Sequence, residues 1–392
     1  MTVATSKAGP YYSSGEIKFS SLRSNFRAQI RKETSSGSET TNNGLNSGSI
    51  SASELLRNVT TTDTNPKVPD ATENANISTS SDWKLSQFRG SIKYYYITQS
   101  DTELNFDIDA QSWNSNLGKN ILKFMFIDGT CGSNSASSPA AQLSATAFNL
   151  TVDVYGSILG ASGKGGGTSG APAISGEKGG DALEMSSPSG ANNIVQVRTN
   201  GKIYAGGGGG EKGFKGADGS NGNCYDSYIN QGGCNCPGCP SGWTDGGCGQ
   251  NFGNHCDRKQ VCGCWGDCWW ESNGDTRYNA CYKNYSVTGG TGGTGGNGGP
   301  GRGYNNQTGS LAGVDGDPGG GKEGCYNGGS YTTSPTDGKK GETGGSGGDW
   351  ATAGEDTTNS GDGGAKGKAI IGSNYSVTGT ISSTTIKGVY NP

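Results

Sequence analysis

The stretch from Gly289 to Gly303 reads GGTGGTGGNGGPGRG, and its spacing sets the architecture of the larger part of the chain. The residues Thr291, Thr294, Asn297 and Pro300 fall at every third position, with two glycines between them. Collagen needs glycine only once in three residues, so this is a different pattern. An extended helix with three residues per turn places the four side chains on one edge and leaves two edges of bare glycine. Bare edges let neighbouring segments approach and exchange backbone hydrogen bonds, because such a helix has none of its own.

Glycine is concentrated in the second part of the chain. Of the 74 glycines among 392 residues, nine fall in residues 1–150 and 65 in residues 151–392. Ordering 65 glycines costs on the order of 65–130 kcal/mol of backbone entropy, so composition alone favours a flexible linker. A linker needs neither a strict period of three nor strand-like segments beside it. We therefore expect a packed bundle of glycine helices.

Short strand-like segments precede the glycine tracts and resemble one another. Apolar and polar residues alternate at 150–155 and 194–198. The six residues Asn-Tyr-Ser-Val-Thr-Gly occur twice, at 284–289 and at 374–379. This repetition predicts stacked units, each of which needs its neighbours. Residues 380–386 are expected to form a closing strand.

The N-terminal part has a different composition. Residues 1–80 are polar and contain two similar segments of the form Ser-Gly-x-Ile, at 14–23 and 47–57. Ser51 and Glu54 have capping-box spacing, which predicts a short helix carrying Leu and Arg in the second segment. Three later runs of β-branched and aromatic residues predict a small β-rich domain. They lie at 92–98, 104–109 and 121–127.

Ten of the twelve cysteines lie close together in an insertion that interrupts the glycine repeat. A short segment with little apolar core is usually stabilised by disulfides, and an even count of ten allows five internal bonds. The predicted disulfide cysteines are Cys224, Cys234, Cys236, Cys239, Cys248, Cys256, Cys262, Cys264, Cys268 and Cys281.

Zinc is the alternative for these cysteines. Cys236 and Cys239 have the spacing of a metal knuckle, and Cys264 with Cys268 would complete four ligands. His255 is the single histidine of the chain and would be a further ligand. The number and irregular spacing of the cysteines favour disulfides, so we expect neither a metal nor another cofactor.

The composition excludes several classes of function. A net charge of −4 and a sequence pI near 5.2 argue against a nucleic-acid partner. With a single histidine, general base chemistry lacks partners, and the glycine runs carry no Gly-Lys-Ser/Thr phosphate loop. A depolymerase with two acids among the 34 available is the enzymatic alternative. We expect no secretory signal and no membrane insertion, because no long apolar stretch occurs.

The alternation of strands and glycine tracts over residues 150–392 resembles the glycine-rich receptor-binding adhesins and distal tail-fibre domains of tailed bacteriophages. The passages at 201–204 and 374–379 carry the resemblance most specifically. In that family, packed polyglycine II helices form a rigid core, and loops at one end contact the host receptor. The paired Ser-Gly-x-Ile segments resemble N-terminal regions of phage virion proteins, including those of cyanophages. The cysteine-rich insertion departs from the family pattern.

The predicted fold is therefore mainly β and irregular, with short strands and a bundle of polyglycine II helices. Its expected parts are a virion-attachment segment at 1–80, a small β-rich domain at 81–149, a glycine-rich repeat domain at 150–392 and, within that domain, the Cys-rich insertion at 224–283. The predicted function is that of a tail fibre protein of the virion that binds the host surface and catalyses no reaction. The alternative is a purely structural or decorating virion component without receptor contact.

The expected partners are other virion proteins, reached through the N-terminal segment, and a protein or polysaccharide receptor on the host. We also expect a homo-oligomer. The aromatic residues of the insertion either cover its cross-links or form the receptor-binding surface. The predicted receptor-binding residues are Trp243, Trp265, Trp269, Trp270 and Tyr278.

Overall fold

The computed structural model describes residues 3–8, 32–33, 39–40, 57–58, 68–69, 76, 94–109, 122–143, 150–168, 173–187, 189–232, 241, 244–250, 259–262, 268–271, 277–326, 329–358 and 361–391. Within these ranges the regular elements are β-strands, and no α-helix occurs. The predicted helix start at Ser51 and Glu54 lies outside them. Arg57, which that helix would have carried, lies in a two-residue strand, β4 (Arg57–Asn58).

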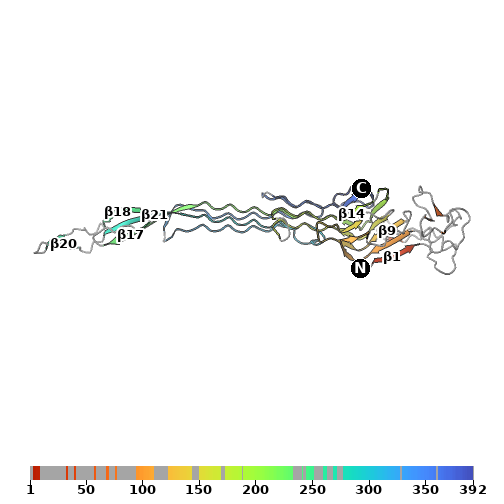
Figure 1. Cartoon of the computed structure of the whole chain (residues 1–392), viewed down its shortest axis with the longest axis horizontal. Helices are drawn as coiled ribbons and strands as arrows, with labels where there is room; N and C mark the ends of the chain where they lie inside the picture. The colour runs from red at the N-terminus through yellow and green to blue at the C-terminus, as the bar shows by residue number, and fades with distance from the viewer. Residues whose placement is uncertain are drawn as a thin grey trace. The chain divides into compact units, whose positions relative to one another are not determined.

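The chain divides into two compact units. Unit 1 comprises Met1–Gly213, Asn297–Val314 and Thr343–Pro392, and unit 2 comprises Phe214–Gly296 and Asp315–Glu342. Strands β9 and β14 belong to unit 1, and β17, β18 and β21 belong to unit 2 (Figure 1).

Unit 1 contains three sheets whose strands have the following bounds. The first sheet contains β1 (Val3–Ala8), β6 (Tyr94–Gln99), β9 (Leu122–Ile127), β12 (Leu150–Val154), β15 (Asn193–Val197) and β24 (Tyr375–Gly379). The second contains β7 (Thr102–Leu104), β10 (Thr130–Gly132), β13 (Ser157–Leu159), β16 (Lys202–Tyr204) and β25 (Ile386–Lys387). The third contains β8 (Phe106–Asp107), β11 (Ala141–Leu143), β14 (Leu183–Ser186) and β23 (Ile370–Ser373).

These strands form a solenoid, because each turn of the chain adds one strand to each sheet. The successive turns are β6-β7-β8, β9-β10-β11, β12-β13-β14, β15-β16-β23 and finally β24-β25. Strands of neighbouring turns pair in parallel, and only β1 joins the first sheet in antiparallel orientation. The prediction of stacked strand units is confirmed for the solenoid, where each turn depends on its neighbours.

The interior of the solenoid is built from aligned apolar side chains. In the first sheet, Ile97, Met125, Val152, Val195 and Val377 occupy equivalent positions in successive strands. The first four are fully buried, and Val377 packs against the core. Burying each such side chain contributes about 1.5–3 kcal/mol, and the alternating pattern of β12 and β15 directs these residues inward.

Two expectations from the sequence differ from the structure. The expected boundary between a β-rich domain at 81–149 and a repeat domain at 150–392 does not interrupt the first sheet, because β9 and β12 pair along their length. Residues 380–386 are not a closing strand, since only Ile386 lies in one. The residues before it form a turn in which Ser382 accepts backbone hydrogen bonds from Thr385 and Ile386.

The chain leaves the solenoid after β13 and again after β16, and the excursions contain the glycine tracts. Residues 206–211 form the central segment of unit 1. Their six backbone N–H groups donate in rotation to three neighbouring segments, and their carbonyls accept from three others, at 2.7–3.0 Å. The surrounding segments are 163–166, 177–180, 299–302, 345–348, 352–355 and 364–367. Each of them meets the central segment at two residues three positions apart.

Unit 2 contains four such segments, at 214–221, 288–296, 315–321 and 334–342. Gly290, Gly293 and Gly296 donate backbone hydrogen bonds to Thr336, Lys339 and Glu342, again at steps of three residues.

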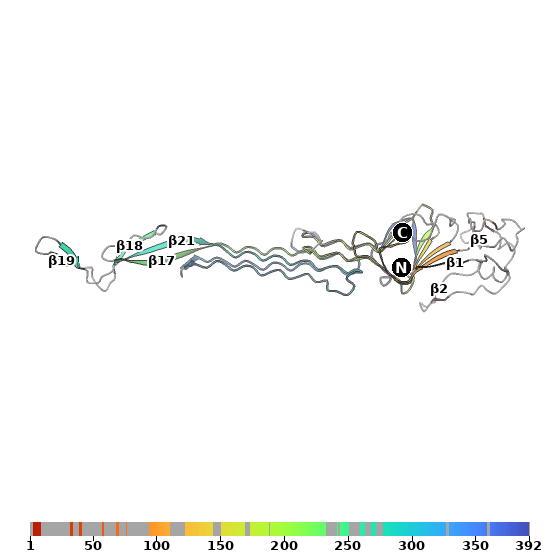
Figure 2. The same cartoon turned by 60° about the horizontal axis from the view of Figure 1, so that its bottom comes forward.

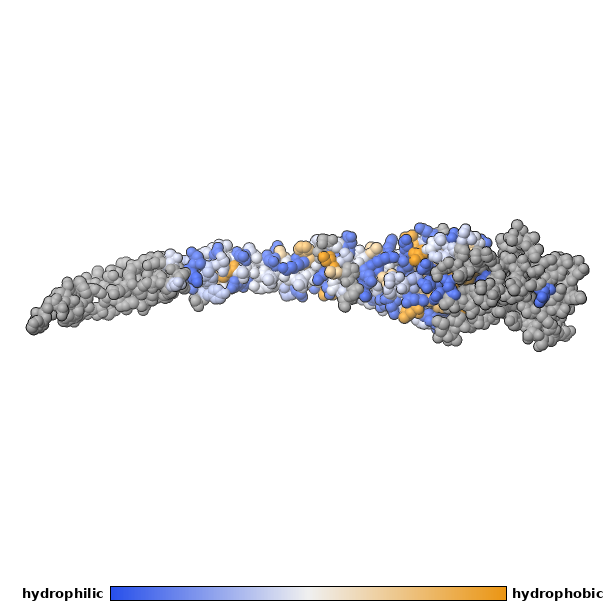
Figure 3. Space-filling model, viewed as in Figure 1, coloured by the Kyte–Doolittle hydropathy of each residue, from blue (hydrophilic) through white to orange (hydrophobic). Residues whose placement is uncertain are grey.

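Figure 3 shows a surface that is mostly hydrophilic (blue and white) over the described residues, with small separate hydrophobic (orange) patches on the face drawn. Within the described residues, no helix has the length and apolar character required to span a membrane.

Two short pairs of strands complete the described elements of the N-terminal region. They are β2 (Lys32–Glu33) with β3 (Glu39–Thr40), and β4 with β5 (Val68–Pro69).

Candidate functional site

A twisted hairpin carries the insertion of unit 2. Its strands β17 (Gly222–Gly232) and β21 (Arg277–Val287) pair antiparallel along their whole length and lie side by side in Figures 1 and 2. Gly222 lies opposite Val287, next to the glycine segments, whereas Gly232 lies opposite Arg277 at the other end. Residues 233–276 are therefore connected to the hairpin at the end away from the glycine segments.

Further strands extend this hairpin. β18 (Thr244–Gln250) pairs with β21, and β22 (Ser330–Thr333) pairs with β17, so the order of the sheet is β18-β21-β17-β22. A separate antiparallel pair within the insertion consists of β19 (Lys259–Cys262) and β20 (Cys268–Glu271).

A disulfide joins Cys224 of β17 to Cys325, which follows the third glycine segment of unit 2. The prediction that Cys224 forms a disulfide is confirmed. Its partner, however, lies outside the insertion, so the ten insertion cysteines do not all pair among themselves. The bond spans 101 residues, and a loop of this length is strongly constrained by a cross-link.

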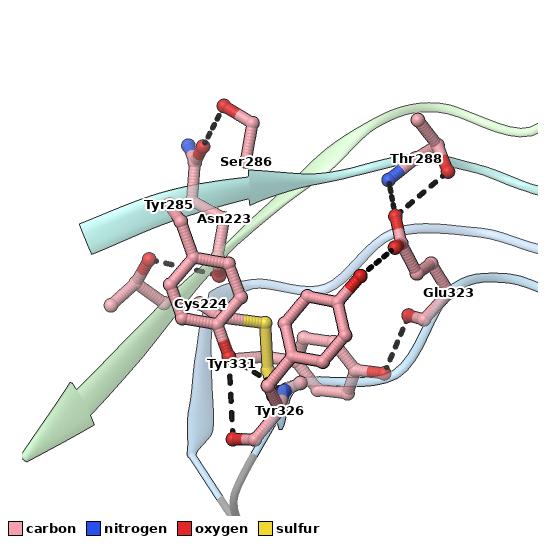
Figure 4. Close-up of a disulfide and its surroundings, with 10 residues drawn as sticks. Asn223, Cys224, Tyr285, Ser286, Thr288, Glu323, Tyr326 and Tyr331 are labelled. Atoms are coloured by element: carbon pink, nitrogen blue, oxygen red, sulfur yellow. Dashed lines mark hydrogen bonds between the residues drawn. A yellow bond between two sulfur atoms is a disulfide. The ribbon is translucent and has the colours of Figure 1, made fainter. Parts of the chain in front are cut away.

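Three tyrosines surround this disulfide (Figure 4). The rings of Tyr285 and Tyr326 lie 5.6 Å apart at an angle of 37°. The Tyr285 hydroxyl accepts a 2.6 Å hydrogen bond from the Tyr326 backbone N–H. The Tyr331 hydroxyl donates to the backbone carbonyl of Glu323 at 3.0 Å, and Lys322 Nζ lies 5.3 Å from the centre of the Tyr331 ring. We call these three residues the tyrosine cluster.

Glu323 connects the tyrosine cluster to the glycine segments. Its Oε2 accepts hydrogen bonds of 2.9 Å from both the backbone N–H and the hydroxyl of Thr288, and its Oε1 accepts one of 2.7 Å from the Tyr326 hydroxyl. The backbone hydrogen bond from Thr288 is the main cause of the lowered pKa of Glu323. The same carboxylate raises the pKa of Tyr326, because the phenol donates to it.

Carboxylates elsewhere in unit 2 have a similar role. Asp218 Oδ1 accepts the backbone N–H of Gly292 at 2.7 Å, which lowers the pKa of Asp218. Glu342 Oε2 accepts the N–H of Phe214 at 3.1 Å. Acidic side chains thus replace carbonyl groups as acceptors between glycine segments.

The predicted receptor-binding residues are only partly described. Trp269 and Trp270 lie in β20, opposite Val261 and Gln260. Tyr278 lies in β21, opposite Gln231 of β17 and Gly249 of β18. Trp243 and Trp265 lie outside the described residues.

The remaining insertion cysteines are distributed in the same way. Cys248, Cys262, Cys268 and Cys281 lie in strands, and Cys262 is opposite Cys268 in the β19–β20 pair. Cys234, Cys236, Cys239, Cys256 and Cys264 lie outside the described residues, as does His255. Their predicted disulfides, and the zinc alternative, stay predictions.

The described part of the chain offers no group of three or more His, Cys, Asp or Glu side chains that could hold a metal ion. Cys131 is a free thiol in the interior of the solenoid, and burial raises its pKa to about 12. A thiol with this pKa is an inert core residue at neutral pH.

Sequence reasoning missed the tyrosine cluster and Cys325. The signal was present in the sequence as an interruption, because Cys325-Tyr326-Asn327 breaks a glycine tract and Tyr331 follows four residues later. A bulky side chain does not fit between closely spaced glycine segments, so it marks a point where such a segment ends.

Comparisons with known proteins identify the family. No curated protein sequence matches the chain. A similar solved structure is the crystal structure of the gp37-gp38 adhesin tip complex of the bacteriophage S16 long tail fibre. It is 18% identical and covers 80% of this chain and 88% of its own, with a TM-score of 0.35. The model of the family described as "Phage tail fibre adhesin Gp38" matches residues 93–314.

This match confirms the predictions of a tail fibre protein of the virion that binds the host receptor and is not an enzyme. The chain belongs to the Gp38 family of phage tail fibre adhesins.

Proposed function

We propose that this adhesin contacts its host through the insertion at 224–283, with Trp265, Trp269 and Trp270 as the main contact residues and Trp243 and Tyr278 beside them. The register of the β17–β21 hairpin carries the proposal, because it connects residues 233–276 at the end away from the glycine segments. Four of the seven tryptophans lie in this part of the chain, and tryptophan and tyrosine dominate the binding energy of known interfaces.

The glycine segments are proposed to be polyglycine II helices that form a rigid support. Backbone hydrogen bonds to different neighbours recur at every third residue, as three residues per turn require. Thr291 and Thr294 are exposed while Gly290, Gly293 and Gly296 are buried, which fits the expected single edge of side chains. A rigid support lowers the ordering cost of binding at its end.

Residues 1–80 are proposed to attach the adhesin to another fibre protein. The S16 structure is described as a complex of gp37 with gp38, and a fibre protein comparable to gp37 is the kind of partner we propose here. The antiparallel addition of β1 to β6 links the N-terminal residues directly to the solenoid.

Deletion of residues 224–281, with the two glycine segments rejoined, tests the proposed contact. The particles should assemble with normal amounts of the adhesin but adsorb to host cells at a small fraction of the wild-type rate. A full-length variant with Trp269→Ala and Trp270→Ala should show the same defect without the deletion. Normal adsorption by both would place recognition outside the insertion.

A further inference from the structure

We infer that the tyrosine cluster is a saccharide-binding platform that takes the apolar face of a neutral pyranose ring on the host surface. The inference rests on the proposed function in one respect, namely that unit 2 meets the host cell. It concerns a different set of residues, at the disulfide end of the hairpin and not in the insertion.

The first observation is the exposure of the rings. Tyr326 is 60% exposed and Tyr331 is 37% exposed. In the described part of unit 2, the other exposed large apolar side chain is Phe214. Two such exposed rings in one cluster contribute little to a core, so their proximity needs a different explanation from packing.

The second observation is that these exposed side chains are held in place. Tyr326 is fixed at its hydroxyl by Glu323, at its backbone N–H by Tyr285, and through its neighbour Cys325 by the disulfide (Figure 4). The Tyr331 hydroxyl is fixed by the Glu323 carbonyl. An exposed ring without freedom to rotate loses little entropy when a ligand stacks on it.

The third observation is the polarity of the surroundings, which selects the class of ligand. Thr333 of β22 is exposed on the same face of the strand as Tyr331 and carries a hydroxyl group, whereas the Thr332 hydroxyl donates to the backbone carbonyl of Asn223. A pyranose presents C–H bonds on one face, which suit the negative face of an aromatic ring, and hydroxyl groups around its rim, which suit Ser, Thr and Lys. An apolar protein partner would instead require aliphatic side chains, and this strand has none.

The local charges favour a neutral sugar. Lys322 and Glu323 are adjacent and opposite in sign, and both oxygens of the Glu323 carboxylate already accept hydrogen bonds. The positively charged Lys322 Nζ lies over the Tyr331 ring and balances the negative charge of the Glu323 carboxylate. The backbone N–H of Lys322 also donates to Asp337 Oδ1 at 2.9 Å, so the carboxylates of Glu323 and Asp337 accompany this lysine and disfavour an anionic ligand.

The test measures binding of the labelled full-length chain to host cells before and after mild periodate oxidation, which cleaves the vicinal diols of sugars. We expect periodate to reduce wild-type binding at least about tenfold. Tyr326→Ala should bind untreated cells about tenfold more weakly and show little further loss on oxidation. Tyr326→Phe, which keeps the ring but loses its hydrogen bond to Glu323, should bind more strongly than Tyr326→Ala and more weakly than the wild type. Phe214→Ala, which alters an exposed ring outside the cluster, should behave like the wild type. Unreduced peptide mapping of the disulfide and an unchanged Tm establish that the variants are folded.

Two results would overturn the inference. One is wild-type binding that resists periodate and is abolished by protease treatment of the cells, which identifies a protein ligand. The other is undiminished binding by Tyr326→Ala. Either result leaves the proposed function intact, whereas full, periodate-sensitive binding by the variant with Trp269→Ala and Trp270→Ala, which keeps the disulfide, would support the platform and contradict the proposed role of the insertion.

Discussion

The substitution Gly293→Ala should destabilise unit 2 strongly, although it adds a single methyl group. A Cβ at this position would lie 2.0 Å from the carbonyl oxygen of Asp317, a backbone atom that no side-chain rotation can move. Restoring even a tight contact requires one segment to shift by about 1 Å. Gly293 donates to Lys339 at 2.9 Å and accepts from Gly216 at 2.8 Å, so the shift would break hydrogen bonds on both sides.

The expected loss follows from these contacts. Two or three backbone hydrogen bonds at about 1 kcal/mol each, with a further cost for groups left unsatisfied, amount to roughly 3–5 kcal/mol. The lower entropy of the unfolded alanine chain offsets about 0.4–1 kcal/mol. A net loss of roughly 2–4 kcal/mol corresponds to a fall in the Tm of unit 2 of about 10 °C or more.

The matched control is Thr294→Ala at the adjacent position. Thr294 is exposed, and its side chain hydrogen-bonds the carboxylate of Asp317 at the surface. Its removal should cost no more than about 1 kcal/mol. Calorimetry of the two variants against the wild type provides the measurement. If Gly293→Ala and Thr294→Ala melt within about 2 °C of each other, the segments are not packed as closely as the hydrogen bonds indicate.

Three further predictions concern other parts of the chain. Replacing both Cys224 and Cys325 by serine should lower stability by about 3–5 kcal/mol, measured as the Tm under non-reducing conditions. The wild type treated with a reducing agent should not keep the Tm of the oxidised wild type. The pKa of Asp218 is lowered chiefly by the N–H of Gly292, so its contribution to stability is complete above its ordinary pKa of 3.8 and is lost as the pH falls through the lowered value. Asp218→Asn should therefore flatten the acid side of a Tm-against-pH curve, and an unchanged curve would exclude this role. In the solenoid, the buried guanidinium of Arg198 donates two 2.6 Å hydrogen bonds to the Asp153 carboxylate. Asp153→Asn breaks this pair and should cost about 3–5 kcal/mol in urea unfolding, whereas a loss below about 1 kcal/mol would contradict the role of the pair.

The strands of the solenoid were predictable where their sequences alternate. β6, β9, β12 and β15 each lie within a predicted run of β-branched and aromatic residues or of alternating polarity, or extend one residue beyond it, because inward and outward side chains differ in polarity along a strand. The exposure of Thr291 and Thr294 was predictable as well, because side chains at every third residue fall on one edge of a helix with three residues per turn.

The order of the strands in the solenoid was not predictable. β16 and β23 belong to the same turn but are separated by the whole glycine-rich excursion, and no local pattern records that they meet. The repeated Asn-Tyr-Ser-Val-Thr-Gly shows the same limit. At 375–379 it forms a parallel strand of the solenoid, whereas its copy at 284–289 ends an antiparallel strand of unit 2. Tertiary partners, and not the six residues themselves, determine which pairing forms.

The candidate site was predictable only in composition. The density of cysteine and tryptophan marks the insertion, but the partner of Cys224 depends on where the third glycine segment of unit 2 ends. The tyrosine cluster combines residues from β21, from the disulfide loop and from β22, and their proximity follows from hydrogen bonds between distant segments. Each residue by itself reads as an ordinary surface tyrosine.

The three-residue rotation of hydrogen bonds around residues 206–211 has a consequence for how such adhesins can change in length. Removing one residue from a segment would direct every later backbone N–H toward a different neighbouring segment from the one that accepts its hydrogen bond now. Removing three residues restores each donor to its former acceptor segment and shortens the segment by roughly 10 Å. Segment lengths should therefore vary in steps of three, with matching steps in the segments alongside. The length of a glycine segment can then change during evolution in steps of three residues without any change in the side-chain contacts.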